Sequence, residues 1–128
     1  MKNIIQIGKY KIGLGRTFIV AEISANHNGS IRIAKRLISE AKKAGADAVK
    51  IQSYTADSIT LNSNKKDFGI NKKAGKAWLS YKNLYNLYKL GQTPFNWHEP
   101  LFKHAKKVGI TIFSSPFFMS SPSFLNLC

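Results

Sequence analysis

The stretch FIVAEISANHNGSIRIAKRLISEAKKAGADAVKIQ, residues 18–52, places two short apolar runs on either side of a segment with helical spacing. The runs, residues 18–23 and 48–52, are nearly continuous in apolar side chains, as buried parallel strands are. Between them, the apolar residues that recur at intervals of three and four are Ile31, Ala34, Leu37, Ile38 and Ala41. Ser30 is of the type preferred at a helix N-cap, and Gly45 is typical of the residue that follows a helix. The stretch therefore predicts a strand–helix–strand unit whose strands run parallel.

The segments on either side of this unit extend the alternation of strands and helices. Polar and apolar residues alternate near the N-terminus, and helical spacing returns twice further along the chain. The predicted elements are a β-hairpin within residues 2–13, a long polar loop over 53–77, helices over 78–90 and 97–108, and a strand over 110–113. This order is typical of two architectures, a (β/α)8 barrel and an open doubly wound sheet. Since a barrel needs eight strands and about 250 residues, the chain would be roughly half of one.

Lysine and arginine outnumber the acidic residues by 20 to 6, which gives a formal net charge of +14. A basic surface can bind nucleic acid, so a basic nucleic-acid-binding module is one alternative function. Most lysines, however, fall between the apolar positions of the predicted helices, which favours ordinary solvated helix faces. The same charge suits an enzyme that acts on anionic small molecules, because it attracts them. Nucleic acid is therefore the less favoured partner.

The composition excludes several other classes of protein. The chain of 128 residues is 44% apolar, enough to form a core, and its only cysteine is Cys128. A disulfide framework and a cysteine-based metal site are therefore excluded. No apolar run approaches the roughly 20 residues that span a bilayer, and the N-terminus lacks the apolar stretch of a secretory signal. We expect a cytoplasmic protein that has no membrane partner.

Polar side chains gather where each predicted parallel strand ends, which is where α/β folds place their chemistry. Those that could act there are Glu22 and Asn26, Lys50 and Gln52, and Ser114 and Ser115. Because side chains alternate along a strand, Lys50 and Gln52 share one face, opposite their apolar neighbours. A lysine inside an apolar strand is costly to bury unless it meets an anion, so Lys50 is predicted to bind one. The alternative is a solvated lysine on an edge strand.

The histidines and the aromatic residues can each be interpreted as functional or as structural. His27, between two asparagines, could ligate a metal or form hydrogen bonds within its loop. His98 and His104 are six residues apart, off a single helix face, and we interpret both as structural. The aromatic residues that could stack on a sugar are Trp78, Tyr81, Tyr85, Tyr88 and Trp97. Packing in a core or lid is the favoured interpretation for most of them.

Three segments resemble motifs of one known enzyme family. They are residues 18–30, 44–52 and 113–117, and they occur in the family's order at similar spacing. The family is that of the sialic-acid-type synthases, which condense phosphoenolpyruvate with an amino-sugar aldehyde to give a nonulosonic acid. Within it, the segments 53–60, 84–88 and 93–98, together with Trp78, are similar to the pseudaminic acid branch. Synthases of N-acetylneuraminate or legionaminate are the enzymatic alternatives.

The resemblance implies an α/β fold, the N-terminal half of a (β/α)8 TIM-type barrel preceded by a short β-hairpin. It implies a transferase reaction in which phosphoenolpyruvate and a 2,4-diacetamido-2,4,6-trideoxy hexose form pseudaminic acid and phosphate. The matching site residues are Glu22 as the catalytic residue, Lys50 and Ser115 for phosphoenolpyruvate, Gln52 as a neighbouring polar residue, and Asn26 near the sugar. The family also implies a homodimer and a divalent metal, Mn²⁺ or Mg²⁺, whose histidine ligands we expect outside these residues.

The C-terminal segment, residues 118–128, differs in character from the rest of the chain. It contains no charged residue, although charged residues make up 20% of the sequence. The family has an acidic residue after the segment that ends at Phe117, and Phe118 stands there instead. We therefore expect residues 1–117 to be a partial barrel domain and residues 118–128 to be an atypical tail, read out of frame. We also expect the chain to be inactive by itself.

Overall fold

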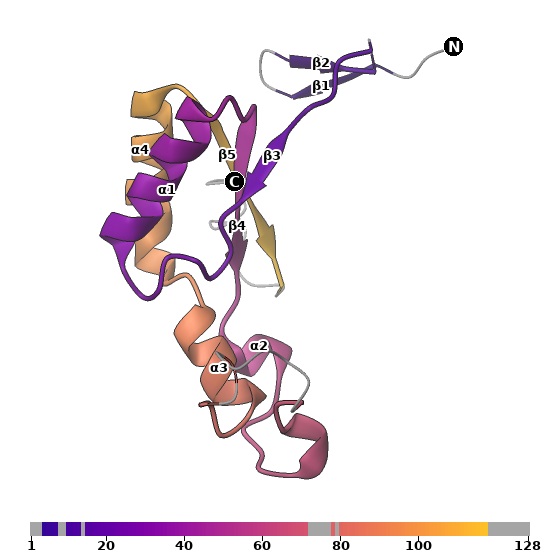
Figure 1. The fold of residues 1–128 in the computed structure, drawn as a ribbon, viewed down its shortest axis with the longest axis vertical. Coiled ribbons are helices and arrows are strands. Elements are labelled where there is room, and N and C mark those ends of the chain that lie inside the picture. Colours follow the sequence, from indigo (N-terminus) through magenta and orange to yellow (C-terminus); the bar gives the residue numbers. More distant parts are fainter. Residues whose placement is uncertain (1–3, 8–9, 14, 72–77, 79, 118–128) are drawn as a thin grey trace.

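The computed structural model describes residues 4–7, 10–13, 15–71, 78 and 80–117, and Figure 1 shows its ribbon. Two strands near the N-terminus, β1 (Ile5–Ile7) and β2 (Tyr10–Ile12), pair antiparallel and form the predicted hairpin. The three strands of a second, parallel sheet are β3 (Val20–Glu22), β4 (Ala48–Ser53) and β5 (Thr111–Pro116). Their order in the sheet, β3-β4-β5, follows their order in the chain, so each strand is added at the same edge.

The two long helices, α1 (Ile31–Lys43) and α4 (His98–Val108), lie side by side on one face of this sheet (Figure 1). Their buried apolar residues join Val49 and Ile51 of β4 in one core cluster. In a barrel all helices lie outside, and the opposite face of the sheet is the interior. The arrangement agrees with the predicted partial barrel.

Helix α1 is bounded by the residues that the sequence predicts. Ser30 Oγ accepts the N–H of Ile33 at 3.4 Å at the start of α1. Gly45 and Gly109 follow α1 and α4 with φ angles of 87° and 74°, in the left-handed region that favours glycine.

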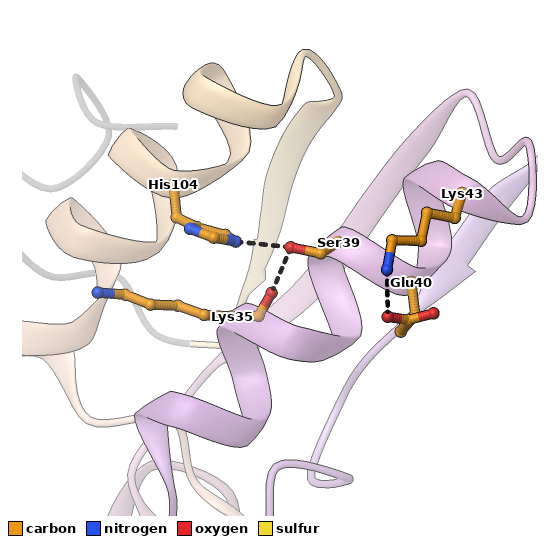
Figure 2. A network of polar contacts seen from close by, with 5 residues as sticks. All are labelled: Lys35, Ser39, Glu40, Lys43 and His104. Carbon is orange, nitrogen blue, oxygen red and sulfur yellow. Dashed lines mark hydrogen bonds and ion pairs between the residues drawn. The ribbon is translucent and has the colours of Figure 1, made fainter.

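A hydrogen bond also joins the two helices to each other. His104 of α4 reaches toward α1, where its Nε2 lies 2.9 Å from Ser39 Oγ, and Ser39 Oγ donates to the Lys35 carbonyl at 3.2 Å (Figure 2). The contact fixes α4 against α1, which agrees with the structural role predicted for His104.

Several predicted boundaries differ from those of the structure. The described part of the expected loop 53–77 holds α2 (Ala56–Ile59) and the 3₁₀ turn η1 (Lys66–Phe68), both too short to show a helical period. The helix expected over 78–90 is α3 (Leu84–Gly91), because Asn83 Oδ1 caps it by accepting the N–H of Asn86 at 3.0 Å. The last strand does not end at residue 113, because β5 pairs with β4 along all six of its residues.

The remaining elements lie at opposite ends of the parallel sheet. Helices α2 and α3 pack together at its carboxyl end, and η3 (Phe95–Trp97) leads from them into α4 (Figure 1). The hairpin lies at the other end, where β3 begins (Figure 1). There Arg16 forms an ion pair with the buried Asp47 and lies 5.5 Å from the Tyr10 ring centroid. The pKa of Asp47 is lowered, mainly by a hydrogen bond of 2.9 Å from the Ile19 N–H and to a smaller extent by the Arg16 guanidinium.

Two further expectations concern the C-terminal tail and helices that could span a membrane. The tail expected over residues 118–128 lies outside the described residues. Within the described ranges, no helix combines the length and apolar character needed to cross a bilayer.

Candidate active site

The sheet face turned away from α1 and α4 carries four of the five predicted site residues. In the strand register, Glu22 lies beside Lys50 and Gln52 lies beside Ser115. Register neighbours point to the same face, as do residues two apart on a strand, so all four side chains share one side of the sheet. Glu22, Gln52 and Ser115 stand at or next to the carboxyl ends of their strands, and Lys50 stands in the middle of β4. Since β4 is the central strand of the described sheet, the edge-strand alternative for Lys50 is wrong.

Glu22 and Lys50 form an ion pair between β3 and β4, with Lys50 Nζ 2.6 Å from Glu22 Oε2. The other carboxylate oxygen, Oε1, accepts the N–H of Ser24 at 3.0 Å. The side chains of Glu22 and Lys50 are 36% and 30% exposed, so a ligand can reach the pair from the open face. An anion that arrives there can compete with Glu22 for the ammonium group. The sequence singled out both residues but did not predict that they pair.

Asn26, the fifth predicted residue, lies in the loop that follows β3. Its Nδ2 donates to the carbonyl oxygen of Ile23 at 2.9 Å. Ser24 and Asn28, on either side of it, have φ angles of 42° and 47°, a region that is unfavourable for residues other than glycine. Backbone of this kind persists where its surroundings hold it, and it clusters at functional sites. The loop directs Asn26 to the wall of a cavity next to the sheet face.

His27 is buried and joins this loop to the segment that follows α3. Its Nδ1 accepts the N–H of Gly29 at 3.1 Å, and its Nε2 lies 3.4 Å from Thr93 Oγ1. The ring meets Trp97 edge-on, with 5.3 Å between ring centroids. Because both ring nitrogens have protein partners, hydrogen bonding is the favoured interpretation of His27 over metal ligation.

A buried hydrogen-bond chain lies behind the strand ends, and the sequence analysis missed it. Ser53 Oγ lies 2.5 Å from His98 Nε2 and also contacts Ser114 Oγ, which donates to the Ile51 carbonyl at 3.3 Å. His98 Nδ1 lies 3.1 Å from the Phe95 carbonyl oxygen, so Nδ1 carries the proton and Nε2 accepts from Ser53. Ser114 is then the donor in its contact with Ser53 Oγ, and it shares its one proton between Ser53 Oγ and the Ile51 carbonyl. The chain ties α4 to β4 and β5 directly behind the predicted site. In the sequence, only a serine at a strand position that faces the helices pointed to this hydrogen-bond chain.

A cavity of about 430 Å³ opens at the carboxyl end of the sheet, between the loop after β3, the end of β4 and α3. Asn26, Asn28 and Gln52 form its polar edge. The aromatic and aliphatic side chains of its wall are those of Tyr54, Trp78, Tyr81, Leu87, Tyr88 and Leu90. Gln52 belongs both to this cavity and to the sheet face that carries Lys50, so the two adjoin.

The described part of the chain provides no set of ligands for the divalent metal that the sequence resemblance implies. Among the described residues, no three His, Cys, Asp or Glu side chains are grouped closely enough to hold an ion. The nearest carboxylate to the site, Glu22, is occupied by Lys50 and Ser24. We therefore derive no chemical step through a metal.

The two buried histidines predict a pH-dependent stability. Burial lowers the pKa of His27 and of His98 below the ordinary 6.5, and hydrogen bonds to backbone oppose this only in part. The unfolded chain then binds more protons than the folded chain below pH 6.5. The free energy of unfolding should therefore fall as the pH drops below this value, by at most about 1.4 kcal/mol per pH unit for each histidine. Urea titrations across this pH range measure the free energy of unfolding. The double variant His98→Gln with His27→Gln should show a flatter dependence of this free energy on pH, and an unchanged dependence contradicts the prediction.

Comparison with known proteins gives consistent matches over most of the chain. The model of a family described as "NeuB family" matches residues 37–128. Pseudaminic acid synthase of Campylobacter jejuni subsp. jejuni serotype O:2 is 49% identical over 121 residues, which are 94% of this chain and 34% of that protein. N,N'-diacetyllegionaminic acid synthase of the same organism is 36% identical over 112 residues, 87% of this chain and 32% of that protein. The chain thus spans about a third of the length of these relatives.

A solved structure shows the same fold. The crystal structure of N-acetylneuraminic acid (sialic acid) synthetase from Leptospira borgpetersenii serovar Hardjo-bovis, in complex with citrate, matches with a TM-score of 0.68 and 31% identity. The match covers 99% of this chain and 38% of that one. The hairpin and the parallel sheet therefore correspond to one part of a larger α/β enzyme.

Proposed function

The chain belongs to the NeuB family, and from this premise we propose that it forms the phosphoenolpyruvate-binding part of a pseudaminic acid synthase. The reaction joins phosphoenolpyruvate to a 2,4-diacetamido-2,4,6-trideoxy hexose and releases phosphate. The structural observation that carries the proposal is the Glu22–Lys50 pair, which stands on the open sheet face with Gln52 and Ser115. The higher identity to the pseudaminic acid synthase, 49% against 36%, favours this sugar over the legionaminate precursor.

Phosphoenolpyruvate carries a phosphate and a carboxylate, and both need cationic or hydroxyl partners. Lys50 supplies an ammonium group on the central strand, and Ser115 supplies a hydroxyl on the same face. When the anion binds, Lys50 exchanges the Glu22 carboxylate for a ligand oxygen, which forms a charge-assisted hydrogen bond. The net charge of +14 helps to attract the anion.

The bond changes define what the remaining site residues do. C3 of phosphoenolpyruvate attacks the aldehyde carbon of the sugar, a C–C bond forms, the aldehyde oxygen takes up a proton to become a hydroxyl, and positive charge develops at C2. Water adds at C2 and loses one proton. Phosphate then leaves with the electrons of its C–O bond while the C2 hydroxyl loses its second proton, so that C2 becomes a ketone. Once Lys50 turns to the substrate, Glu22 is a free carboxylate on the same face and can accept the proton from that water. Gln52 and Asn26 lie on the side of the cavity, where the sugar would bind.

The proposal also covers the location, the oligomeric state and the metal of the whole enzyme. We infer a cytoplasmic homodimer that uses phosphoenolpyruvate and the amino sugar as substrates and a divalent metal, Mn²⁺ or Mg²⁺, held by residues outside the described part of the chain. Two of the exposed lysines, Lys43 and Lys103, pair with Glu40 and Glu99 on their own helices at 2.9 and 2.6 Å, as on an ordinary solvated helix face.

A chimera tests the proposed function. It joins residues 1–117 of this chain to the remaining part of the Campylobacter jejuni pseudaminic acid synthase. We expect it to release phosphate from phosphoenolpyruvate and to form the nonulosonic acid when the diacetamido trideoxy hexose is present. The 128-residue chain alone should show no turnover, because its described sheet has three strands and the reaction site of a barrel is built from eight.

The controls for the chimera separate function from folding. The relative's remaining part without residues 1–117 should be inactive. A chimera with the circular dichroism and size of the natural relative, but without activity, would falsify the proposed function. Activity with the N-acetylneuraminate or legionaminate precursor alone would assign the chain to one of those two branches instead.

A further inference from the structure

We propose that Ser53 is a positioning residue for the phosphoenolpyruvate site. Ser53 is the centre of the buried hydrogen-bond chain, and through it the end of β5 is fixed so that the Ser115 hydroxyl keeps its place on the open face. The inference rests on the proposed function, in which Ser115 offers this hydroxyl to phosphoenolpyruvate.

The carboxyl end of β5 has little apolar packing to hold it. The core cluster reaches this part of the chain through Ile110, just before the strand, and Ile112. The strand then ends in Ser114, Ser115 and Pro116, and none of its six residues is fully buried. Apolar contacts thus hold the beginning of β5, and the position of its end depends on hydrogen bonds to β4.

Ser53 provides such bonds on both sides of Ser115. Its Oγ contacts Ser114 Oγ, and its carbonyl oxygen accepts the N–H of Phe117 at 3.0 Å. The Ser53 side chain is fully buried and is itself anchored to α4, with His98 Nε2 2.5 Å from its Oγ. Ser115 therefore lies between two attachments to one residue of the central strand.

A hydroxyl group at position 53 is not what packing alone favours. Val49 and Ile51, on the same helix-facing side of β4, are apolar and belong to the core cluster. An apolar side chain at position 53 would extend this cluster, but apolar contacts have no direction. A buried hydrogen-bond network whose members all have partners makes its surroundings rigid and specifies one arrangement. This network meets the condition, since among the described residues every buried side-chain nitrogen or oxygen has a partner.

The arrangement bears directly on an anion at Lys50. In the strand register Ser115 lies beside Gln52, which is two residues, or about 7 Å, from Lys50 along the same strand face. An anion held by Lys50 meets the Ser115 hydroxyl with good geometry only while the end of β5 keeps its place, because hydrogen bonds weaken steeply when they are distorted. Ser53 faces the helices and does not reach the ligand, so it acts through Ser115.

A matched pair of serine variants in the chimera tests the inference. Ser53 and Ser39 each lie within hydrogen-bond distance of the Nε2 of a histidine on α4, at 2.5 and 2.9 Å, but Ser39 belongs to α1, away from the site (Figure 2). Ser53→Ala should raise the KM for phosphoenolpyruvate by about 10-fold, as expected when a hydrogen bond to a charged group is lost, and leave the KM for the sugar unchanged. Ser39→Ala removes the same group and should change neither constant.

A double-mutant cycle with Ser115 separates positioning from stability. Ser115→Ala should itself raise the KM for phosphoenolpyruvate. Ser53→Ala in the same molecule should cause no further rise, because the hydroxyl through which Ser53 acts is already absent. If the two effects on this KM add, Ser53 does not act through Ser115 and the inference is overturned.

Hydrogen exchange of β5, followed by mass spectrometry, gives a readout that needs no turnover. Peptides that cover this strand should exchange faster in the chimera with Ser53→Ala than in the one with Ser39→Ala. An active chimera in which Ser53→Ala leaves the KM for phosphoenolpyruvate unchanged overturns the inference while the proposed function stands. If the chimera is inactive, the proposed function fails; equal exchange in the two variants then overturns the inference as well, whereas faster exchange in Ser53→Ala supports the positioning of Ser115.

Discussion

Replacement of Lys50 by alanine is expected to lower kcat/KM for phosphoenolpyruvate in the chimera by roughly 30- to 1,000-fold, which corresponds to about 2–4 kcal/mol. The reason is the position of the side chain. Lys50 is on the central strand, only 30% exposed, and its one described ionic partner is Glu22 at 2.6 Å. Without the ammonium group, phosphoenolpyruvate would meet an unpaired Glu22 carboxylate, which repels it. The loss therefore combines a missing attraction with a new repulsion.

The matched control is a lysine of equal charge away from the sheet face. Lys43 of α1 pairs with Glu40 at 2.9 Å, and its side chain is 71% exposed (Figure 2). Lys43→Ala removes the same charge and should change kcat/KM by less than about twofold, since exposed ion pairs contribute little. Lys50→Arg keeps the charge and should recover part of the loss. Equal kinetics for Lys50→Ala and Lys43→Ala would remove Lys50 from the proposed site.

The strand–helix–strand core could be predicted because its signals are local. Apolar spacing, the Ser30 cap and Gly45 each act over a few residues, and the structure confirms them at α1. The side-chain alternation along β4 also predicts that Lys50 and Gln52 share one face, and the strand register confirms it. A period of two in a strand is a geometric property of the backbone, so it holds without knowledge of the neighbours.

The choice between a barrel and a doubly wound sheet could not be made from periodicity. Both architectures have the same order of elements, and in both of them consecutive right-handed crossovers in one direction put their helices on one face. They differ in whether the sheet closes on itself or reverses its strand order, which depends on pairing between distant strands. The resemblance of three motifs to one family supplied the answer that local patterns lacked.

The sequence predicted that Lys50 and Gln52 share a face of the sheet, but it did not predict the contacts between the candidate residues. Glu22 and Lys50 pair because register places β3 beside β4, and no pattern within either strand specifies register across the sheet. The chain from His98 to Ser53 and Ser114 likewise joins residues 45 and 61 positions apart. Contacts over such separations depend on the tertiary fold, so single-residue signals give candidates and the structure supplies their partners.

Replacement of Glu22 by glutamine should lower kcat of the chimera by roughly 100- to 10,000-fold and leave the KM for phosphoenolpyruvate unchanged or reduced. Glutamine keeps an oxygen for the Ser24 N–H, now 3.0 Å from Oε1, so the loop after β3 should hold its position. It cannot accept the proton of the attacking water, which lowers turnover. It also releases Lys50 from its ion pair, so the anion no longer competes with a carboxylate and binding does not suffer.

The control for this variant is Glu40→Gln, which breaks a similar ion pair, with Lys43 at 2.9 Å, on an exposed face of α1 (Figure 2). It should leave both kcat and KM unchanged. Steady-state kinetics with each substrate varied in turn separate the two constants, and a burst of phosphate measured by rapid quench reports the chemical step itself. A rise in KM with kcat intact would mean that Glu22 serves binding and not proton transfer. In that case the general base is another residue, and Glu22 acts by holding Lys50 in place until phosphoenolpyruvate arrives.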